Sequence, residues 1–207
     1  MKEKDKNQKT VEAYDKNPQF YADKFDSYGV RFEDIDRAIK LNESGSDTVL
    51  ELGCGNGRDA QYIISKVGKD NYTGVDASEG LIKLAIEKNP VGTFHVKDML
   101  APDLYVSLET RGIIFSFASV LHLKREELAD LILKCHKILK IGGILYISTK
   151  YGEYRELEIE NLGSKKYYYP YTPEDIKKLA GLDFETVYSV IQDSDYGPEM
   201  VIALRKI

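Results

Sequence analysis

The chain has 207 residues and a formal net charge of −5; 43% of its residues are hydrophobic and 30% are charged. This length accommodates one α/β domain with a full core and is too short for a cofactor domain plus a separate catalytic domain, and two cysteines are too few for a disulfide framework or a metal-ligand cluster. A nucleic-acid partner would need clustered Lys and Arg, and no apolar run approaches the roughly 20 residues of a membrane helix, so we expect a cytoplasmic protein that binds neither.

The first 45 residues are predicted to be mainly helical. Residues 1–10 are charged and no apolar stretch follows them, so we expect neither a signal peptide nor an anchor, and a frayed end. Tyr14, Tyr21 and Tyr28 recur at seven-residue spacing. The pattern over residues 11–41 predicts one or two amphipathic helices.

Five apolar segments predict buried strands, and segments of helical periodicity follow several of them. These strands are expected at 48–52, 72–76, 93–98, 112–117 and 142–149. Ser78 can cap the helix that follows the second strand. Strands that alternate with helices pair in parallel through right-handed crossovers, which predicts an α/β fold with an open, doubly wound sheet and helices on both faces.

The C-terminal region departs from this alternation. Thr172, Pro173 and Asp175 form the start of a helix with a capping box. The apolar segments 184–191 and 199–206 are then separated only by QDSDYGP. Because this spacing is typical of a hairpin, the last strand is predicted to be antiparallel.

The segment VLELGCGNGRDA, residues 49–60, joins the first strand to a helix through alternating glycines. Gly53, Gly55 and Gly57 permit backbone angles that other residues resist, and they let a ligand approach the main chain. The same segment satisfies the dinucleotide fingerprint G-x-G-x-x-A, and Asp76 lies about 20 residues further on, where a ribose-binding acid is expected. The turn alone therefore leaves two classes of cofactor open.

Three further features favour a positively charged cofactor over a nicotinamide dinucleotide. Glu51 places a carboxylate at the strand end, which would repel a pyrophosphate and attract a sulfonium or amino group. Asp98 can accept a hydrogen bond from an adenine amino group while the apolar Met99 packs against the ring. The two Tyr-x-x-x-Lys pairs, at 62–66 and 146–150, are misplaced for hydride transfer, and no metal is predicted.

Five segments, taken in order, resemble the successive motifs of class I, Rossmann-like S-adenosylmethionine-dependent methyltransferases of the small, single-domain bacterial type. They are VLELGCGNGRDA, GVDASEGLIKLA, HVKDML, IIFSFASVLHL and KILKIGGILYIS. The resemblance covers roughly residues 10–205. It implies S-adenosylmethionine as the cofactor and a seven-stranded, mostly parallel sheet of order 3-2-1-4-5-7-6 with strand 7 antiparallel.

The resemblance also implies a set of cofactor contacts. Glu51, Gly53 and Gly55 would line the methionine part, and Asp76 would hold the ribose hydroxyls. Asp98 and Met99 would recognise the adenine, and Phe117 would lie near the transferable methyl group. Ala77 would be a further cofactor contact. One position departs from the family pattern. Gly112 stands where many relatives open the fourth strand with an acid, so no role of that acid is transferred to this chain.

Several residues have both a functional and a structural interpretation. His122 could act as a general base or pack in its loop. Arg58 could bind the methionine carboxylate, although a solvated position in the first helical turn is slightly favoured. Tyr14 and Tyr21 could form a lid, as N-terminal helices do in similar proteins, or pack on the sheet. The tyrosines of residues 150–171 could line an acceptor site or cover the sheet edge.

We therefore predict a methyltransferase that acts on a small-molecule acceptor by in-line transfer, as a monomer or homodimer. An NAD(P)-binding oxidoreductase and a non-catalytic cofactor-binding module remain as alternatives. The whole chain, 1–207, is predicted to be one domain. Its parts are an N-terminal helical lid region (1–45), the cofactor-binding core (46–150), a substrate-side insertion (151–171) and a C-terminal helix and hairpin (172–207).

Overall fold

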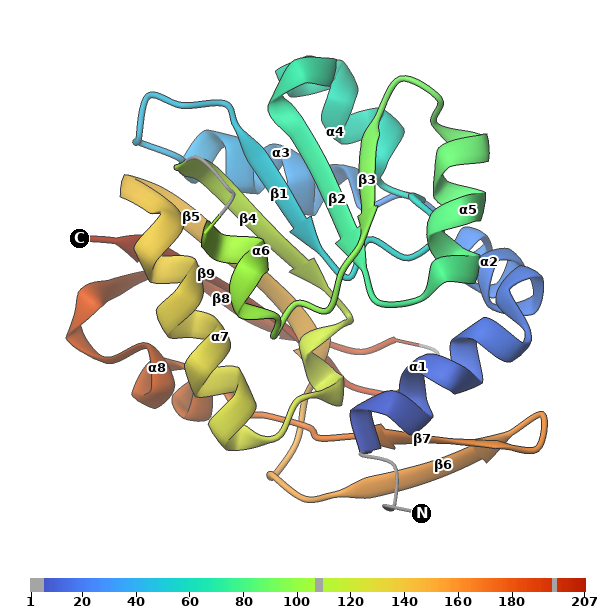
Figure 1. Cartoon of the computed structure of the whole chain (residues 1–207). Helices are drawn as coiled ribbons and strands as arrows, with labels where there is room; N and C mark the ends of the chain where they lie inside the picture. The colour runs from blue at the N-terminus through green and yellow to red at the C-terminus, as the bar shows by residue number, and fades with distance from the viewer. Residues whose placement is uncertain (1–5, 107–109, 195–196) are drawn as a thin grey trace.

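A seven-stranded sheet forms the centre of the computed structural model, which describes residues 6–106, 110–194 and 197–207 (Figure 1). Its strands are β1 (Val49–Leu52), β2 (Tyr72–Asp76), β3 (Thr93–Val96), β4 (Arg111–Phe117), β5 (Leu139–Lys150), β8 (Phe184–Gln192) and β9 (Glu199–Lys206). The order is β3-β2-β1-β4-β5-β9-β8. Strands β1 to β5 are parallel, and β9 runs antiparallel to β5 and β8. The predicted order is therefore confirmed, with β9 and β8 in the places of strands 7 and 6.

Helices cover both faces of this sheet, as predicted. One face packs against α3 (Phe32–Leu41), α4 (Ala60–Val67) and α5 (Glu79–Lys88), and the other against α6 (Pro102–Val106), α7 (Arg125–Ile138) and α8 (Pro173–Ala180). Short 3₁₀ turns lie at η1 (Lys69–Asn71), η2 (Val120–His122) and η3 (Gly181–Asp183). Side chains alternate between the two faces, so that Leu50 and Leu52 join one hydrophobic cluster and Val49 joins the other.

The N-terminal region contains three helices, where the sequence predicted one or two. Helix α1 (Lys6–Lys16) ends before α2 (Pro18–Ser27), because Pro18 has no N–H and cannot continue a preceding helix. A second break follows at Gly29, whose φ is +71°. The expectation of a frayed end is wrong from Lys6 onward, and residues 1–5 lie outside the described part of the chain.

Residues 151–171 contain a hairpin that the sequence analysis did not predict. Strands β6 (Leu157–Asn161) and β7 (Ser164–Tyr168) form a separate antiparallel pair, and α1 lies beside β7 (Figure 1). The connecting residues Leu162 and Gly163 have φ values of 52° and 66°. Positive φ at both positions matches a two-residue hairpin turn, although Leu-Gly is not the usual sequence for one.

Gly112 has a steric reason to depart from the family pattern. A Cβ atom at this position would lie 1.9 Å from the carbonyl oxygen of Ser46. An acidic side chain would therefore require a shift of the backbone at the start of β4.

None of the helices in the described ranges combines the length and the apolar character needed to cross a membrane.

Candidate active site

A cavity of about 680 Å³ lies at the carboxyl ends of the parallel strands, and residues of α1 line its other side. This edge is where ligands bind in open α/β sheets. Every residue predicted for the site lines the cavity except Tyr21, namely Glu51, Gly53, Gly55, Arg58, Asp76, Ala77, Asp98, Met99, Phe117 and His122. The structure thus brings these residues together, and the role of each is a proposal.

The glycine turn brings the main chain against neighbouring groups. Gly53, Gly55 and Gly57 have φ values of 73°, 56° and 67°, and a Cβ on Gly53 would lie 2.3 Å from Cβ of Ser119. The N–H of Gly55 donates a 2.9 Å hydrogen bond to Oδ2 of Asp76. Because these positions require left-handed backbone or close approach, glycine is needed at this turn.

The two carboxylates predicted at the ends of β1 and β2 differ in exposure, since Glu51 is buried and Asp76 is half-buried. Glu51 is 2% exposed and accepts a 2.6 Å hydrogen bond from the Tyr72 hydroxyl. Burial, reinforced by the nearby charge of Asp59, raises the pKa of Glu51 to about 8. Burial also raises the pKa of Asp76, whose Oδ1 accepts a 2.9 Å hydrogen bond from the N–H of Ser78. A cation bound beside Glu51 would favour its ionised form.

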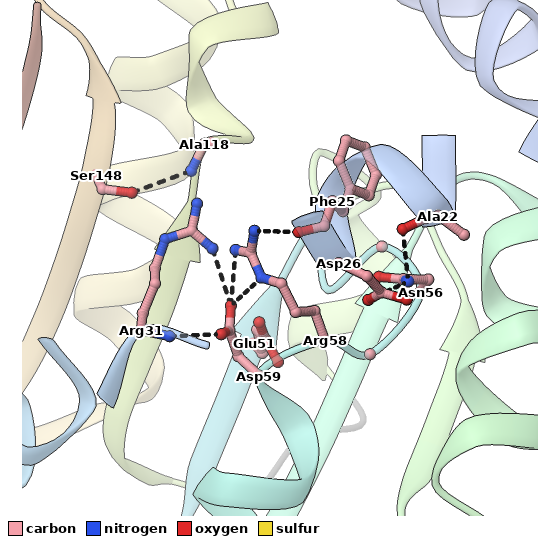
Figure 2. Close-up of polar contacts among 12 residues, drawn as sticks. Ala22, Phe25, Asp26, Arg31, Glu51, Asn56, Arg58, Asp59, Ala118 and Ser148 are labelled. Atoms are coloured by element: carbon pink, nitrogen blue, oxygen red, sulfur yellow. Dashed lines mark hydrogen bonds and ion pairs between the residues drawn. The ribbon is translucent and has the colours of Figure 1, made fainter. Parts of the chain in front are cut away.

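Two arginines converge on one buried acid at the wall of the cavity (Figure 2). Asp59 Oδ2 lies 2.9 Å from Arg31 Nη1 and 3.0 Å from Arg58 Nη2, and Asp59 Oδ1 accepts a 3.0 Å bond from the Arg31 N–H. Arg58 Nη1 donates to the Phe25 carbonyl at 3.0 Å. The prediction that Arg58 is solvated is wrong: its side chain is 10% exposed and tied to Asp59 and Phe25.

Sequence reasoning missed Arg31 and Asp59 as site residues. They are 28 residues apart and lie just before α3 and α4, so no local pattern joins them. The Arg31 guanidinium also lies 5.0 Å from the centre of the Phe117 ring. A single arginine in a loop gives little sequence signal of such a contact, because solvated arginines are common on protein surfaces.

At the end of the cavity near β3, the predicted acid Asp98 is followed directly by the predicted apolar residue Met99. Asp98 is exposed, and its Oδ1 accepts a 2.8 Å hydrogen bond from the N–H of Leu100. Met99 is half-buried, and its carbonyl accepts a 2.7 Å bond from the Tyr105 hydroxyl. Tyr105 thereby fixes the main chain that carries both residues.

His122 lies on the cavity wall between α1 and the hairpin. Its Nδ1 is 2.9 Å from the Tyr167 carbonyl oxygen and its Nε2 is 3.0 Å from the Tyr14 hydroxyl. Burial lowers the pKa of His122 to about 4, so the ring is neutral near pH 7. Because a carbonyl can only accept, Nδ1 carries the proton and Nε2 accepts from the Tyr14 O–H.

The N-terminal helices cover the cavity, but the two tyrosines differ in position. Tyr14 lines the cavity, whereas Tyr21 is 1% exposed and packs edge-on against Tyr14 with ring centres 4.7 Å apart. Tyr21 therefore does not reach the cavity, and the expectation that it contacts a ligand there is wrong. Asp15 holds α1 on α5 by accepting from the Ser78 hydroxyl at 2.6 Å and the Gly80 N–H at 3.0 Å.

The tyrosines of residues 150–171 do not line the cavity. Tyr167, Tyr169 and Tyr171 are buried in the hydrophobic cluster below α7 and α8. Of the two interpretations open from sequence, coverage of the sheet edge is therefore the one that the packing favours for these three. In the ranges that the structure describes, no group of three or more His, Cys, Asp and Glu side chains is arranged to hold a metal ion.

Comparisons with known proteins agree with this geometry. A protein-family model described as "Methyltransferase domain" matches residues 49–143. Phosphoethanolamine N-methyltransferase of Plasmodium falciparum is 28% identical over 158 residues, which are 73% of this chain and 58% of that protein. A putative methyltransferase of invertebrate iridescent virus 6 is 37% identical over 60 residues, 29% of this chain and 23% of that protein. The chain thus spans less than two thirds of the length of these relatives.

Solved structures show the same fold at low sequence identity. An S-adenosylmethionine-dependent methyltransferase from Clostridium acetobutylicum superposes with a TM-score of 0.70 at 14% identity, over 94% of this chain and 99% of that one. A TehB-like S-adenosylmethionine-dependent methyltransferase from Corynebacterium glutamicum gives 0.67 at 20% identity, with the same coverage of both chains. These likenesses establish the fold.

Proposed function

We propose that this chain, whose residues 49–143 form a methyltransferase domain of the class I, Rossmann-like fold, transfers a methyl group from S-adenosylmethionine to a small-molecule acceptor. The observation that carries the proposal is that two carboxylates, the buried Glu51 and the half-buried Asp76, line one cavity on either side of the glycine turn. The ionised form of Glu51 would attract a sulfonium with an α-amino group, which in turn favours that form, and it would repel a pyrophosphate.

The residues present fit this cofactor. A cavity of about 680 Å³ is in the range of small-molecule sites, roughly 300–1,000 Å³. The Asp76 carboxylate offers about four acceptor positions. The N–H groups of Gly55 and Ser78 donate to it, and it keeps acceptor capacity for a ribose hydroxyl. We assign the adenine end to Asp98 and Met99, and the methyl end to Phe117.

When bound, S-adenosylmethionine supplies a methyl group on a sulfonium, and the acceptor's lone pair forms the new bond to carbon as the carbon–sulfur bond breaks and its electron pair goes to sulfur. The residues of the chain align the acceptor with that bond and exclude water. Glu51 compensates positive charge near the sulfonium. Phe117 and the N-terminal helices close the cavity around the reacting atoms.

We propose a small amine as the acceptor class. The part of the wall formed by α1, η2 and α7 includes the carboxylates of Glu12 and Glu127, and none of its described residues is Lys or Arg. The relative from Plasmodium falciparum is named for transfer to nitrogen, which agrees with this choice. The Tyr14 hydroxyl donates a hydrogen bond to His122, so its oxygen can accept a hydrogen bond from an acceptor N–H and orient the nitrogen lone pair.

The first test is calorimetric titration of S-adenosylmethionine and S-adenosylhomocysteine into the wild type, Asp76→Asn and the control Asp70→Asn. Asp76→Asn keeps the shape of the side chain that accepts from Gly55 and Ser78. We expect binding to be lost or weakened at least tenfold in Asp76→Asn and unchanged in Asp70→Asn, whose side chain is exposed on η1. Binding that is equal in all three proteins would contradict the assigned site.

The second test is a product assay with small amines and, as the comparison set, catechols and carboxylic acids of similar size. Turnover of amines supports the proposed acceptor class, and turnover of carboxylic acids alone contradicts it. Binding of the cofactor with no turnover of any acceptor would favour the non-catalytic module. Binding of a nicotinamide dinucleotide in place of S-adenosylmethionine would favour the oxidoreductase.

A further inference from the structure

The two arginines at the cavity wall differ in how many of their donors are used. Arg58 donates through Nε and Nη2 to Asp59 and through Nη1 to the Phe25 carbonyl, so each of its nitrogens has an acceptor. Arg31 uses its Nη1 on Asp59, and no described residue accepts from its Nε or Nη2. A guanidinium carries five N–H donors in a fixed fork.

The unused side of Arg31 faces the cavity. Arg31 lines the cavity, its side chain is 20% exposed, and Figure 2 shows one terminal nitrogen directed away from Asp59 toward Ala118, which also lines the cavity. The ring of Phe117 supports one face of the guanidinium at 5.0 Å. Asp59 fixes the other end, so the free donors are held in place before any ligand arrives.

We propose that Arg31 is the anion-binding residue of this cavity and that it binds the carboxylate at the amino-acid end of the cofactor. The proposal rests on the proposed function for the identity of the cofactor. Glu51 lies on the same wall, close enough for the charge of Arg31 to oppose the rise in its pKa. An enclosed carboxylate and a free guanidinium fork in one cavity match the two charges of an α-amino acid, an ammonium and a carboxylate.

Arg31 thus takes a role that the sequence left open for Arg58, for which a solvated position was slightly favoured. Both arginines bind the Asp59 carboxylate, but only Arg31 keeps N–H donors for a ligand. An anionic group on the acceptor has the same chemistry as the cofactor carboxylate, and Phe117 places Arg31 near the predicted methyl end. The experiment must therefore separate the two sources.

The variants are Arg31→Gln, Arg31→Lys and the matched control Arg37→Gln. Arg37 also binds an aspartate, Asp34, at 2.7 Å with a 28% exposed side chain, and it does not line the cavity. Arg58 remains on Asp59 in the Arg31 variants, so the buried carboxylate keeps one partner. Thermal unfolding of each variant checks that the fold is retained.

The ligands are S-adenosylhomocysteine, which has the amino-acid end, and 5′-methylthioadenosine, which lacks it. We expect Arg31→Gln to raise the Kd of S-adenosylhomocysteine by roughly 10- to 100-fold, as for loss of a charge-assisted pair. The Kd of 5′-methylthioadenosine should stay within about twofold of the wild-type value. Arg31→Lys keeps the charge without the fork and should lie between wild type and Arg31→Gln. Arg37→Gln should match the wild type.

Other outcomes have distinct meanings. Equal weakening of both ligands, or no weakening of either with an unchanged acceptor KM, overturns the proposal. If both ligands bind as in the wild type and the KM of the acceptor is raised, Arg31 binds an anionic group of the acceptor. That result overturns the assignment to the cofactor. Failure of the wild type to bind either ligand would refute the proposed function itself, which separates that failure from failure of the Arg31 assignment.

Discussion

Glu51 and Asp59 are two acids enclosed at the same wall, but their partners give them different roles. Asp59 has two guanidinium groups within 3.0 Å, whereas Glu51 has only the neutral Tyr72 hydroxyl as a hydrogen-bond partner in the described chain. Glu51 is therefore the acid whose ionisation a bound cation can change. Asp59 is the acid that holds the arginines.

Cofactor binding is expected to depend on pH through Glu51. The pKa of Glu51 is raised to about 8, so the group is mostly protonated near pH 7, and a cationic ligand must favour release of that proton. Affinity should rise from pH 6 to pH 8 by up to about tenfold per unit, and calorimetry in two buffers of different ionisation enthalpy should show proton release. Glu51→Gln should bind more weakly at pH 8 and lose the pH dependence; a wild-type affinity that is flat over this range would contradict the expectation.

The same shift affects the ligand-free protein in a defined direction. Because the folded pKa of Glu51 is raised above the ordinary value, its contribution to stability is fully present at pH values below about 4.5 and is lost as the pH rises through about 8. Glu51→Gln should therefore reduce the fall in Tm between pH 5 and pH 8. Scanning calorimetry of both proteins without ligand measures this difference.

Tyr14 and His122 are expected to position the acceptor. A ring whose pKa is about 4 is a weak proton acceptor near neutrality, so orientation through Tyr14 fits better than free general-base catalysis. Tyr14→Phe and His122→Asn should each lower kcat by roughly 10- to 100-fold, leave S-adenosylhomocysteine affinity unchanged and combine without additivity. The wild-type kcat should show no inflection near pH 6.5, and an inflection there would indicate a titrating His122.

At the scale of elements, the N-terminal helices and the hairpin enclose the cavity from outside the central sheet. Helix α1 is held on α5 through Asp15 and lies beside β7, where Thr10 Oγ1 accepts a 3.2 Å bond from the Tyr167 N–H. Lys88 of α5 binds Asp26 of α2 at 2.6 Å. The cover of the cavity is thus held in place by contacts between segments distant in sequence.

Lys166 of β7 is the expected weak point of this cover. It is 5% exposed, with the rings of Tyr21, Tyr14 and Tyr168 at 4.2, 4.8 and 5.8 Å from Nζ, and no described residue forms a hydrogen bond or ion pair with Nζ. Burial, with the charge of Lys24, lowers its pKa to about 8. The charged form therefore opposes folding below that pH, because ring faces replace hydration only in part.

Lys166→Met is expected to raise Tm at pH 7, since it keeps the length of the side chain and removes the buried charge. A gain of 1 kcal/mol corresponds to roughly 2–4 °C for a domain of this size. Lys165→Met is the control, because Lys165 is exposed and pairs with Glu158 on the surface; it should change Tm by less than about 1 °C. A lower Tm for Lys166→Met would show that the tyrosine rings outweigh the cost of burying the charge.

At the scale of the whole molecule, the cavity lies between the central sheet and the N-terminal helices that cover it. Its wall includes residues of α1, the glycine turn, the β2 and β4 ends and η2, so a bound ligand contacts both the sheet and its cover. A ligand that binds this arrangement stabilises the folded chain over the unfolded one.

S-adenosylhomocysteine at 100 times its Kd is expected to stabilise the protein by about 2.7 kcal/mol, which raises Tm by roughly 5–11 °C. The effect should be much smaller in Asp76→Asn at the same concentration. Tyrosine fluorescence can follow the transition, since the chain has 15 tyrosines and no tryptophan. No change in Tm for the wild type at saturating ligand would contradict binding to the folded state.

The sequence determined the sheet because its signals are local. Apolar runs, the glycine turn and the hairpin spacing each act within a few residues. They predicted the strands of the central sheet, and all but one of the predicted site residues line the cavity. The β6–β7 hairpin escaped because its Leu162–Gly163 turn lacks the usual composition. The break before Pro18 was visible in sequence, but the seven-residue spacing of the tyrosines ran through it and obscured it.

Tertiary structure decided which charges are free. The guanidinium groups of Arg31 and Arg58 look alike in sequence, and only the folding of the N-terminal helices onto the glycine turn brings both to Asp59 and leaves one fork unused. The same folding buries Tyr21, brings Tyr14 to His122 and encloses Glu51. Burial and pairing arise between segments distant in the chain, so the sequence by itself determined the fold and the position of the site, while the ionisation and hydrogen bonding of its residues depended on the assembled structure.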